Sequence, residues 1–316
     1  MVALFNRSGQ AQDDWDAGSL RERFRAWWDG DEILEPSPEP ARVQEPEPKH
    51  EVHYEVPSQR WETTRVGLVQ KVWGQGFANP GGREHILNMV KIFGLDPAMT
   101  VLDLGAGLGG AARIMCEKFG VWVTGLEADA DLAEAAMELS VKAGMSEKVP
   151  INVFDPETFQ YKPNSVNCVF SKEFLFTIEM KQEFLATIEL LLKKKGQFLF
   201  TDYVLAKPHG RSETVTKWLD QEPMKAHPWS TETFEEALAS VHLEIRVMED
   251  VTQAFRSMVI QGWSDYIGAT PRGSVGEDSA PMLLDEIELW TRRIQAIDSG
   301  DLKVCRVHTF KKESEG

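Results

Sequence analysis

The segment VLDLGAGLGG, residues 101–110, constrains the fold of this chain more than any other feature. Apolar residues and one acid lead directly into four glycines, and the amphipathic run AARIMCEKF follows at once. Glycine has no Cβ and tolerates positive φ, so a strand that ends in glycines at the start of a helix lets the backbone approach a ligand closely. Such a junction is typical of sites for nucleotide-type cofactors, although a GxGxG pattern alone also occurs in ordinary tight turns.

Strands and helices alternate in the region that starts with this segment. Apolar runs bounded by loop residues predict further buried strands over VWVTGLEAD, PINVFDPE, VNCVFSKE and GQFLFTDY. Helical patterns are expected at about 109–119, 130–144 and 179–194. This alternation predicts an α/β fold with a doubly wound, Rossmann-like parallel sheet.

Two acids fall at the ends of predicted strands. Glu127 comes 24 residues after Asp103, where a carboxylate can accept both hydroxyls of a ribose. The alternative is an exposed acid that opens the next helix. Asp155 ends the third strand, where it is suited to accept a hydrogen bond from an adenine amino group. Its alternative is an Asx turn before Pro156.

Hydride transfer with a dinucleotide and methyl transfer from S-adenosylmethionine compete as functions of this site. Dinucleotide sites usually space their glycines as GxGxxG, whereas DLGAGLG runs from Asp103 to Gly109 here. That segment resembles the first motif of the class I methyltransferases. The resemblance implies S-adenosyl-L-methionine as cofactor, with Glu127 on the ribose and Asp155 on the adenine side. The implied cofactor-binding residues are Asp103, Gly105, Ala106, Gly107, Gly109, Glu127, Ala128, Asp155, Pro156 and Ser171.

Two further segments are similar to the phosphoethanolamine N-methyltransferases and related small-molecule enzymes. They are WGQGFANPGG, residues 73–82, and the strand end Thr201-Asp202-Tyr203. The resemblance implies that residues 73–82 form part of a lid over the methionine end of the cofactor, which adds Gly81 and Gly82 to the binding residues. A flexible turn between two helices is the alternative.

The end of the fourth strand departs from that group. The chain reads SKEFLFTI from Ser171, with Glu173 in the aspartate position and without the catalytic histidine that follows in the phosphobase enzymes. Glu173, Asp202 and Tyr203 are the candidate catalytic residues, because a protonated amine needs a base before it can attack. Asp202 as a helix cap and Tyr203 as a core residue are the alternatives. An acceptor that needs little base, such as a thioether or a carboxylate, stays open, as does a hydroxyl.

The expected domain is residues 59–316, preceded by an N-terminal helix and an acidic, proline-rich linker over 1–58. The resemblance implies a seven-stranded, mainly parallel sheet with an antiparallel last strand and helical cap insertions at about 204–230 and 251–300. Aromatic residues of the insertions are candidates for an ammonium cage or for the core. They are Trp218, Trp229, Trp263, Tyr266 and Trp290. Arg292, Arg293 and Arg306 are candidates for binding an acidic group of the acceptor.

Composition excludes several classes of partner. The net charge of −16 opposes binding to nucleic acid, and no apolar run is long enough for an integral membrane segment. Three widely spaced cysteines do not predict a metal site or a disulfide framework, and a cytoplasmic location is expected. The favoured function is methylation of a small metabolite or lipid precursor, with an amine among the candidates. A non-catalytic, cofactor-binding interaction module is the alternative, and association with a second copy stays open.

Overall fold

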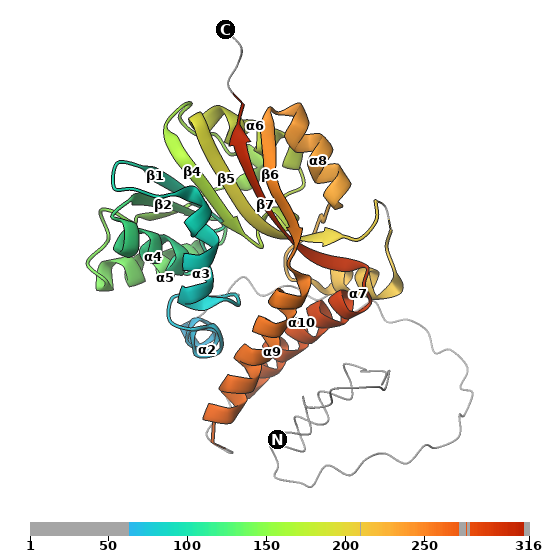
Figure 1. Cartoon of the computed structure of the whole chain (residues 1–316). Helices are drawn as coiled ribbons and strands as arrows, with labels where there is room; N and C mark the ends of the chain where they lie inside the picture. Colours follow the sequence, from blue (N-terminus) through green and yellow to red (C-terminus); the bar gives the residue numbers. More distant parts are fainter. Residues whose placement is uncertain (1–62, 209, 272–275, 277–278, 313–316) are drawn as a thin grey trace, which may run out of the picture.

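The computed structural model describes residues 63–208, 210–271, 276 and 279–312. Seven strands of this part of the chain form one sheet in the order β3-β2-β1-β4-β5-β7-β6, with helices on both faces (Figure 1). The strands are β1 (Thr100–Leu104), β2 (Trp122–Glu127), β3 (Ile151–Val153), β4 (Val166–Lys172), β5 (Leu192–Leu205), β6 (Leu243–Asp250) and β7 (Leu302–Lys311).

The first five strands run parallel, whereas β7 is antiparallel to both β5 and β6. The doubly wound sheet with an antiparallel last strand is therefore confirmed. The helix and linker expected over residues 1–58 lie outside the described residues. No helix of the described part is both long and apolar enough to cross a membrane.

Helices follow the strands in the expected alternation. The α-helices are α2 (Thr63–Trp73), α3 (Gly82–Val90), α4 (Gly110–Phe119), α5 (Ala130–Lys142), α6 (Lys181–Leu191), α7 (Glu213–Gln221), α8 (Thr231–Ser240), α9 (Thr252–Ala269) and α10 (Ala280–Asp298). Short 3₁₀ turns are η2 (Lys91–Phe93), η3 (Pro156–Thr158) and η4 (Leu175–Thr177).

The helix expected at 179–194 ends earlier, at Leu191. Leu192 already has extended backbone angles and pairs with Val166, so β5 begins where the sequence pattern still favoured helix. The Lys193 ammonium donates a hydrogen bond to the Asn167 side chain, 2.9 Å away. Pairing with β4 therefore overrides the local helical preference.

Helices α3, α4 and α5 cover one face of the sheet, called here the α3 face, while α6 and α8 cover the other, the α6 face. Side chains alternate between the faces along each strand. On β5, Phe198, Phe200 and Val204 belong to the core of the α6 face. Leu199 packs in the core of the α3 face, so Thr201 and Tyr203 share its side and Asp202 lies on the α6 face.

A third hydrophobic cluster joins the ends of β5 and β7 to four helices, α2, α7, α9 and α10. We call these four helices the cap. Helices α9 and α10 lie side by side at one end of the sheet, with α2 and α7 against them (Figure 1). Trp73 of α2 packs tilted on Trp290 of α10, with ring centroids 4.7 Å apart, and edge-on to Trp263 of α9 at 5.9 Å. The cap is thereby held against the carboxyl end of β5.

Candidate active site

The glycine turn between β1 and α4 has the backbone that its sequence predicts. Gly105, Gly107 and Gly109 have φ values of 70°, 54° and 71°, in the left-handed region that favours glycine. A Cβ on Gly105 would lie 2.3 Å from the ring of Phe174, so a side chain has no room there. A Cβ on Gly107 would meet nothing within 4 Å. The backbone at Gly107 therefore borders open space that a ligand can enter.

Glu127 is the last residue of β2 and lies beside that turn. One carboxylate oxygen accepts the N–H of Gly107 at 2.8 Å, and the other accepts the N–H of Asp129 at 3.1 Å. Burial raises the pKa of Glu127, while these N–H groups lower it. Each oxygen has two lone pairs, so the backbone bonds leave acceptor capacity for two hydroxyl groups.

Asp103 places a second buried carboxylate beneath the same turn. Burial is the largest cause that raises the pKa of Asp103 to about 7, and the nearby charge of Glu127 raises it further. The N–H of Ala112 and the charge of Arg113 lower that pKa by less. Its Oδ2 has no hydrogen-bond partner among the described residues. The carboxyl group therefore gains or loses its proton near neutral pH.

Two other cofactor candidates, Asp155 and Ser171, have local partners. Asp155 caps η3, with one oxygen on the N–H of Glu157 and the other on the hydroxyl of Thr158, both at 3.0 Å. This is the Asx turn before Pro156. Ser171 is fully buried and donates its hydroxyl hydrogen to the carbonyl of Leu104 at 2.9 Å. Ser171 therefore ties β4 to β1, whereas Asp155 and Ala128 are exposed and Pro156 is half-buried.

The segment 74–82 lies across the start of α4. A Cβ on Gly110 would come within 2.4 Å of the carbonyl oxygen of Gly76, so the two backbones touch. The N–H of Gly76 bonds the side chain of Gln70 at 2.9 Å. Gly81, with φ of 125°, stands at the N-cap position of α3, and no side chain caps that helix. The segment therefore packs on the start of α4 at Gly76 and leads into α3 at Gly82.

Glu173 follows β4 in a strained backbone conformation. Its φ is 48°, unusual for a residue with a side chain, and only 7% of its surface is exposed. One carboxylate oxygen accepts the hydroxyl of Thr201 at 2.7 Å, and the other forms an ion pair with the ammonium of Lys172. The backbone N–H of Glu173 also bonds the carbonyl of Thr201 at 2.7 Å. The side chain is thus fixed on the α3 face.

Tyr203 lies further along the same face, packed inside the cap. Its ring is edge-on to Phe176 at 5.0 Å and to Phe255 at 5.6 Å, and tilted on Trp218 at 5.7 Å. The guanidinium of Arg293 lies 5.8 Å from the ring centroid. Burial raises the pKa of Tyr203, so its hydroxyl stays protonated.

Asp202 points the opposite way from its two neighbours. It is fully buried on the α6 face, opposite Cys305 of β7. Of the three catalytic candidates, the structure therefore places Glu173 and Tyr203 on one side of β5 and Asp202 on the other.

The charged and aromatic residues of the insertions have partners inside the protein. Arg293 forms a buried ion pair with Glu222, and Arg306 pairs with Glu249 at 3.0 Å. The indole N–H of Trp218 donates to Glu222 at 2.7 Å. Trp218, Trp263 and Trp290 are buried in the cap, as the core alternative expects.

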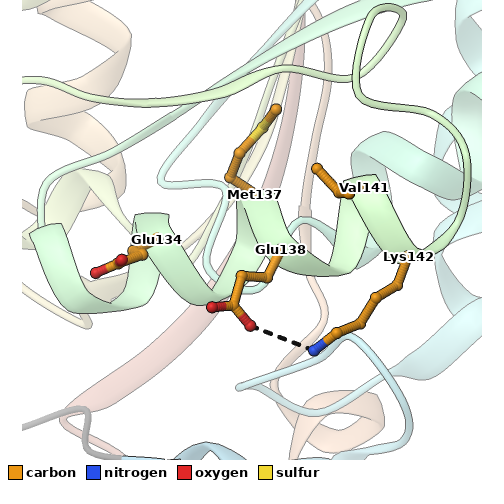
Figure 2. Close-up of a pocket in the computed structure, with 5 residues that line it drawn as sticks. All are labelled: Glu134, Met137, Glu138, Val141 and Lys142. Atoms are coloured by element: carbon orange, nitrogen blue, oxygen red, sulfur yellow. Dashed lines mark hydrogen bonds and ion pairs between the residues drawn. The ribbon is translucent and has the colours of Figure 1, made fainter.

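A surface hollow of about 270 Å³ lies away from this site, on the exposed side of α5 (Figure 2). Its lining residues are Glu134, Met137, Glu138, Val141 and Lys142. Glu138 and Lys142 form an ion pair at 3.2 Å. None of them belongs to the glycine turn or to the strand ends. We assign no ligand to this hollow.

Comparison with known proteins agrees with this geometry. The phosphoethanolamine N-methyltransferase 1 of Arabidopsis thaliana is 29% identical over 200 residues, which are 63% of this chain and 40% of that protein. The Caenorhabditis elegans phosphoethanolamine N-methyltransferase 2 is 27% identical over 66% of this chain and 53% of its own length. The chain thus spans about half the length of these curated relatives.

Solved structures share the fold. Haemonchus contortus phosphoethanolamine N-methyltransferase 2, determined with S-adenosyl-L-methionine, superposes with a TM-score of 0.70 at 22% identity, over 78% of this chain and 57% of that one. The family model described as a methyltransferase domain matches residues 95–257, just over half of the 316 residues. The chain therefore belongs to the methyltransferase domain family, as its glycine turn and strand order predict.

Proposed function

We propose that this protein transfers a methyl group from S-adenosylmethionine to a small metabolite or lipid precursor, with a small amine as the favoured acceptor. The observation that carries the proposal is the position of Glu127, whose carboxylate lies at the end of β2 beside the open backbone of Gly107. Membership of the methyltransferase domain family supports the reaction. The names of the matched relatives, phosphoethanolamine N-methyltransferases, support the amine.

The residues at the glycine turn suit an adenosyl group. Glu127 would bind the ribose hydroxyls with the lone pairs that its backbone bonds leave unused. The uncapped first turn of α3, after Gly81 and Gly82, offers backbone N–H groups to a carboxylate such as that of the methionine moiety. S-adenosylmethionine, when bound, supplies a methyl group already activated by a positively charged sulfur.

A protonated amine must lose a proton before its nitrogen can attack a methyl group. Glu173 is the group that we assign to accept it, at a carboxylate oxygen held between the hydroxyl of Thr201 and the ammonium of Lys172. These partners fix the orientation of the carboxylate before the acceptor arrives. A carboxylate in a buried, fixed position can both attract the ammonium and remove its proton.

The cap supplies orientation and keeps water away. Tyr203, Phe176 and Trp218 present a buried aromatic wall on the side of Glu173. Holding two reactants in line removes much of the entropic barrier to a displacement, on the order of 7–11 kcal/mol in well-oriented systems. We assign this wall to the acceptor side of the reaction.

Thr177 lies in the stretch after Glu173, residues 174–178, which contains no histidine. Its hydroxyl donates to the carbonyl of Phe174 at 2.8 Å, so it closes η4. The proposed proton transfer therefore uses a carboxylate without an imidazole. This difference favours acceptors whose amine is easily deprotonated near a carboxylate.

The test is a panel of acceptors assayed by release of S-adenosylhomocysteine. The panel contains ethanolamine, phosphoethanolamine, glycine and sarcosine, with a thioether, a carboxylic acid and a phenol as contrasts. Turnover with at least one amine, and none with the contrasts, is the expected result. Cofactor binding by calorimetry with no turnover across the panel would instead support a non-catalytic module, and absence of cofactor binding would end the proposal.

A further inference from the structure

Lys181 is a charged residue that the structure buries completely. It is the first residue of α6, and its ammonium donates hydrogen bonds to the carbonyls of Leu175 and Ile178, both at 2.6 Å. The ammonium also lies 5.3 Å from the ring centroid of Trp229. Lysine is rarely buried in full, because its ammonium loses hydration there. These contacts replace water, and two of them tie down the turn η4.

Asp202 is a buried acid on the α6 face of the sheet, the face that α6 and Lys181 cover. Neither of its carboxylate oxygens has a hydrogen-bond partner among the described residues. The N–H groups of Tyr203 and Phe176 face the carboxylate and lower its pKa, without forming well-aligned bonds, while burial raises that pKa well above its usual range. The charge of Lys181 is the largest influence in the other direction. Lys181 and Asp202 are thus both buried, and the charge of each shifts the pKa of the other toward its ionised form.

The turn η4 and the two residues before it contact the candidate site. Glu173 and Phe174 lead into the turn, and Phe176 belongs to it. The ring of Phe174 packs so closely on Gly105 that a Cβ there would overlap it. The ring of Phe176 packs on Tyr203, and its carbonyl accepts the N–H of His227 at 2.6 Å. A shift of η4 would consequently move the proposed base and the aromatic wall together.

We propose that Lys181 and Asp202 are positioning residues for methyl transfer: Lys181 fixes η4, and through it Glu173, Phe174 and Phe176, by its hydrogen bonds to two carbonyls, and Asp202 is the buried acid whose charge acts on that ammonium. Asp202 acts through the lysine and the turn, and does not touch the acceptor. The inference rests on the proposed function, since it assigns these residues to the same reaction. It differs from the resemblance-based expectation that Asp202 meets the substrate directly.

The experiment compares Lys181→Met, Asp202→Asn and the double variant with the wild type. Two readouts are used: kcat with the acceptor found in the panel, and hydrogen exchange of the amides at 174–178 in the protein without cofactor. Lys181→Met removes the cation that acts on Asp202 and the ammonium that donates to two carbonyls. We expect kcat to fall on the order of 10- to 100-fold, as for a reacting group displaced by about 1 Å.

Exchange at 174–178 should rise in the same variant, and kcat should fall more than the affinity for S-adenosylmethionine, since Glu127 lies on β2, outside η4. Asp202→Asn keeps the shape of the side chain, so it should fold, lower kcat less and loosen η4 less. The double variant should be no worse than Lys181→Met alone, because the two residues act as one unit.

Lys311→Met is the matched control. The Lys311 ammonium also donates to two backbone carbonyls near the other end of α6, those of Glu189 at 2.7 Å and Leu192 at 3.0 Å. It should leave kcat and exchange at 174–178 unchanged. Asp202→Asn with wild-type exchange and abolished kcat would overturn the inference, since that result assigns Asp202 to the acceptor. Additive effects in the double variant would overturn it too. A wild type without turnover on any acceptor counts against the proposed function, while the exchange data still decide the role of the pair.

Discussion

The carboxylate of Glu127 accepts the N–H of Gly107 at 2.8 Å, which joins the acid at the end of β2 to the glycine turn after β1. The two elements are neighbours in the sheet, because β1 and β2 pair in parallel up to Leu104 and Leu126. The hydrogen bond orders the turn before any ligand arrives, so the turn needs little rearrangement to bind one. Preorganisation of this kind raises affinity by lowering the cost of ordering.

A side chain at Gly107 should block the cofactor without unfolding the protein. The Cβ of Gly107→Val would meet no protein atom within 4 Å and would lie in the open space beside the turn. We expect calorimetry to show no binding of S-adenosylmethionine at concentrations that saturate the wild type. Gly144→Val is the control, because Gly144 has a similar φ of 67° and equally open surroundings at the end of α5. Equal binding by the two variants would contradict the placement of the adenosyl group.

Replacing the proposed base should lower turnover and leave cofactor binding intact. Glu173→Gln keeps the size of the side chain and an oxygen for the hydroxyl of Thr201, but it cannot take up a proton. Loss of general-base assistance typically costs about 10²- to 10⁴-fold in rate, so we expect kcat/KM to fall by that order. Steady-state kinetics and calorimetry on one preparation measure both effects. A variant with wild-type kcat/KM would assign proton transfer to another group.

The stability of the protein should depend on pH through Asp103. Its pKa rises from 3.8 to about 7 in the folded state, so folding favours the protonated form. The stabilising contribution is therefore complete below about pH 4 and is lost as pH rises to about 7. A shift of this size corresponds to roughly 4 kcal/mol of unfolding free energy. Urea denaturation of Asp103→Asn should lack this component, and a wild-type pH profile in the variant would contradict it.

The buried ion pair of the cap should contribute far more to stability than an exposed pair. Arg293→Met leaves Glu222 buried and without its cation, a change that costs about 3–5 kcal/mol in comparable cases. Arg83→Met breaks a surface pair with Glu117, and we expect little change from it. Thermal unfolding of the two variants measures the contrast. Similar losses in both would show that the cap does not depend on this pair.

Sequence patterns predict the sheet and the glycine turn well because both depend on local signals. The alternation of apolar runs with helical patterns gives the parallel strands, and the acid at Glu127 follows from its place after the second strand. The structure adds that Asp202 faces the α6 side. Side chains alternate between the two faces along β5, so Asp202 lies on the same face as Phe198 and Phe200, which pack in the core of the α6 face.

The role of Lys181 could not be predicted in the same way. A lysine in the first turn of a helix is normally solvated, and nothing in the neighbouring residues distinguishes this one. Its burial depends on contacts with the carbonyls of η4 and with Trp229, which lies 48 residues away along the chain. Such contacts arise only when the sheet brings β4, β5 and α6 together. Residues fixed by long-range packing of this kind leave no local pattern.

The position of β7 links the closing of the sheet to the covering of the site. Strand β6 pairs with β7, β7 pairs with β5, and the cap helices α9 and α10 lie in the connection between β6 and β7. In a folding intermediate that lacks β7, only the five parallel strands would be paired, and the cap helices α9 and α10 would not be held at the end of β5. Pairing of β7 both completes the sheet and places α9 and α10 against the end of β5, so the cap depends on contacts between residues far apart in the sequence, which form slowly in folding.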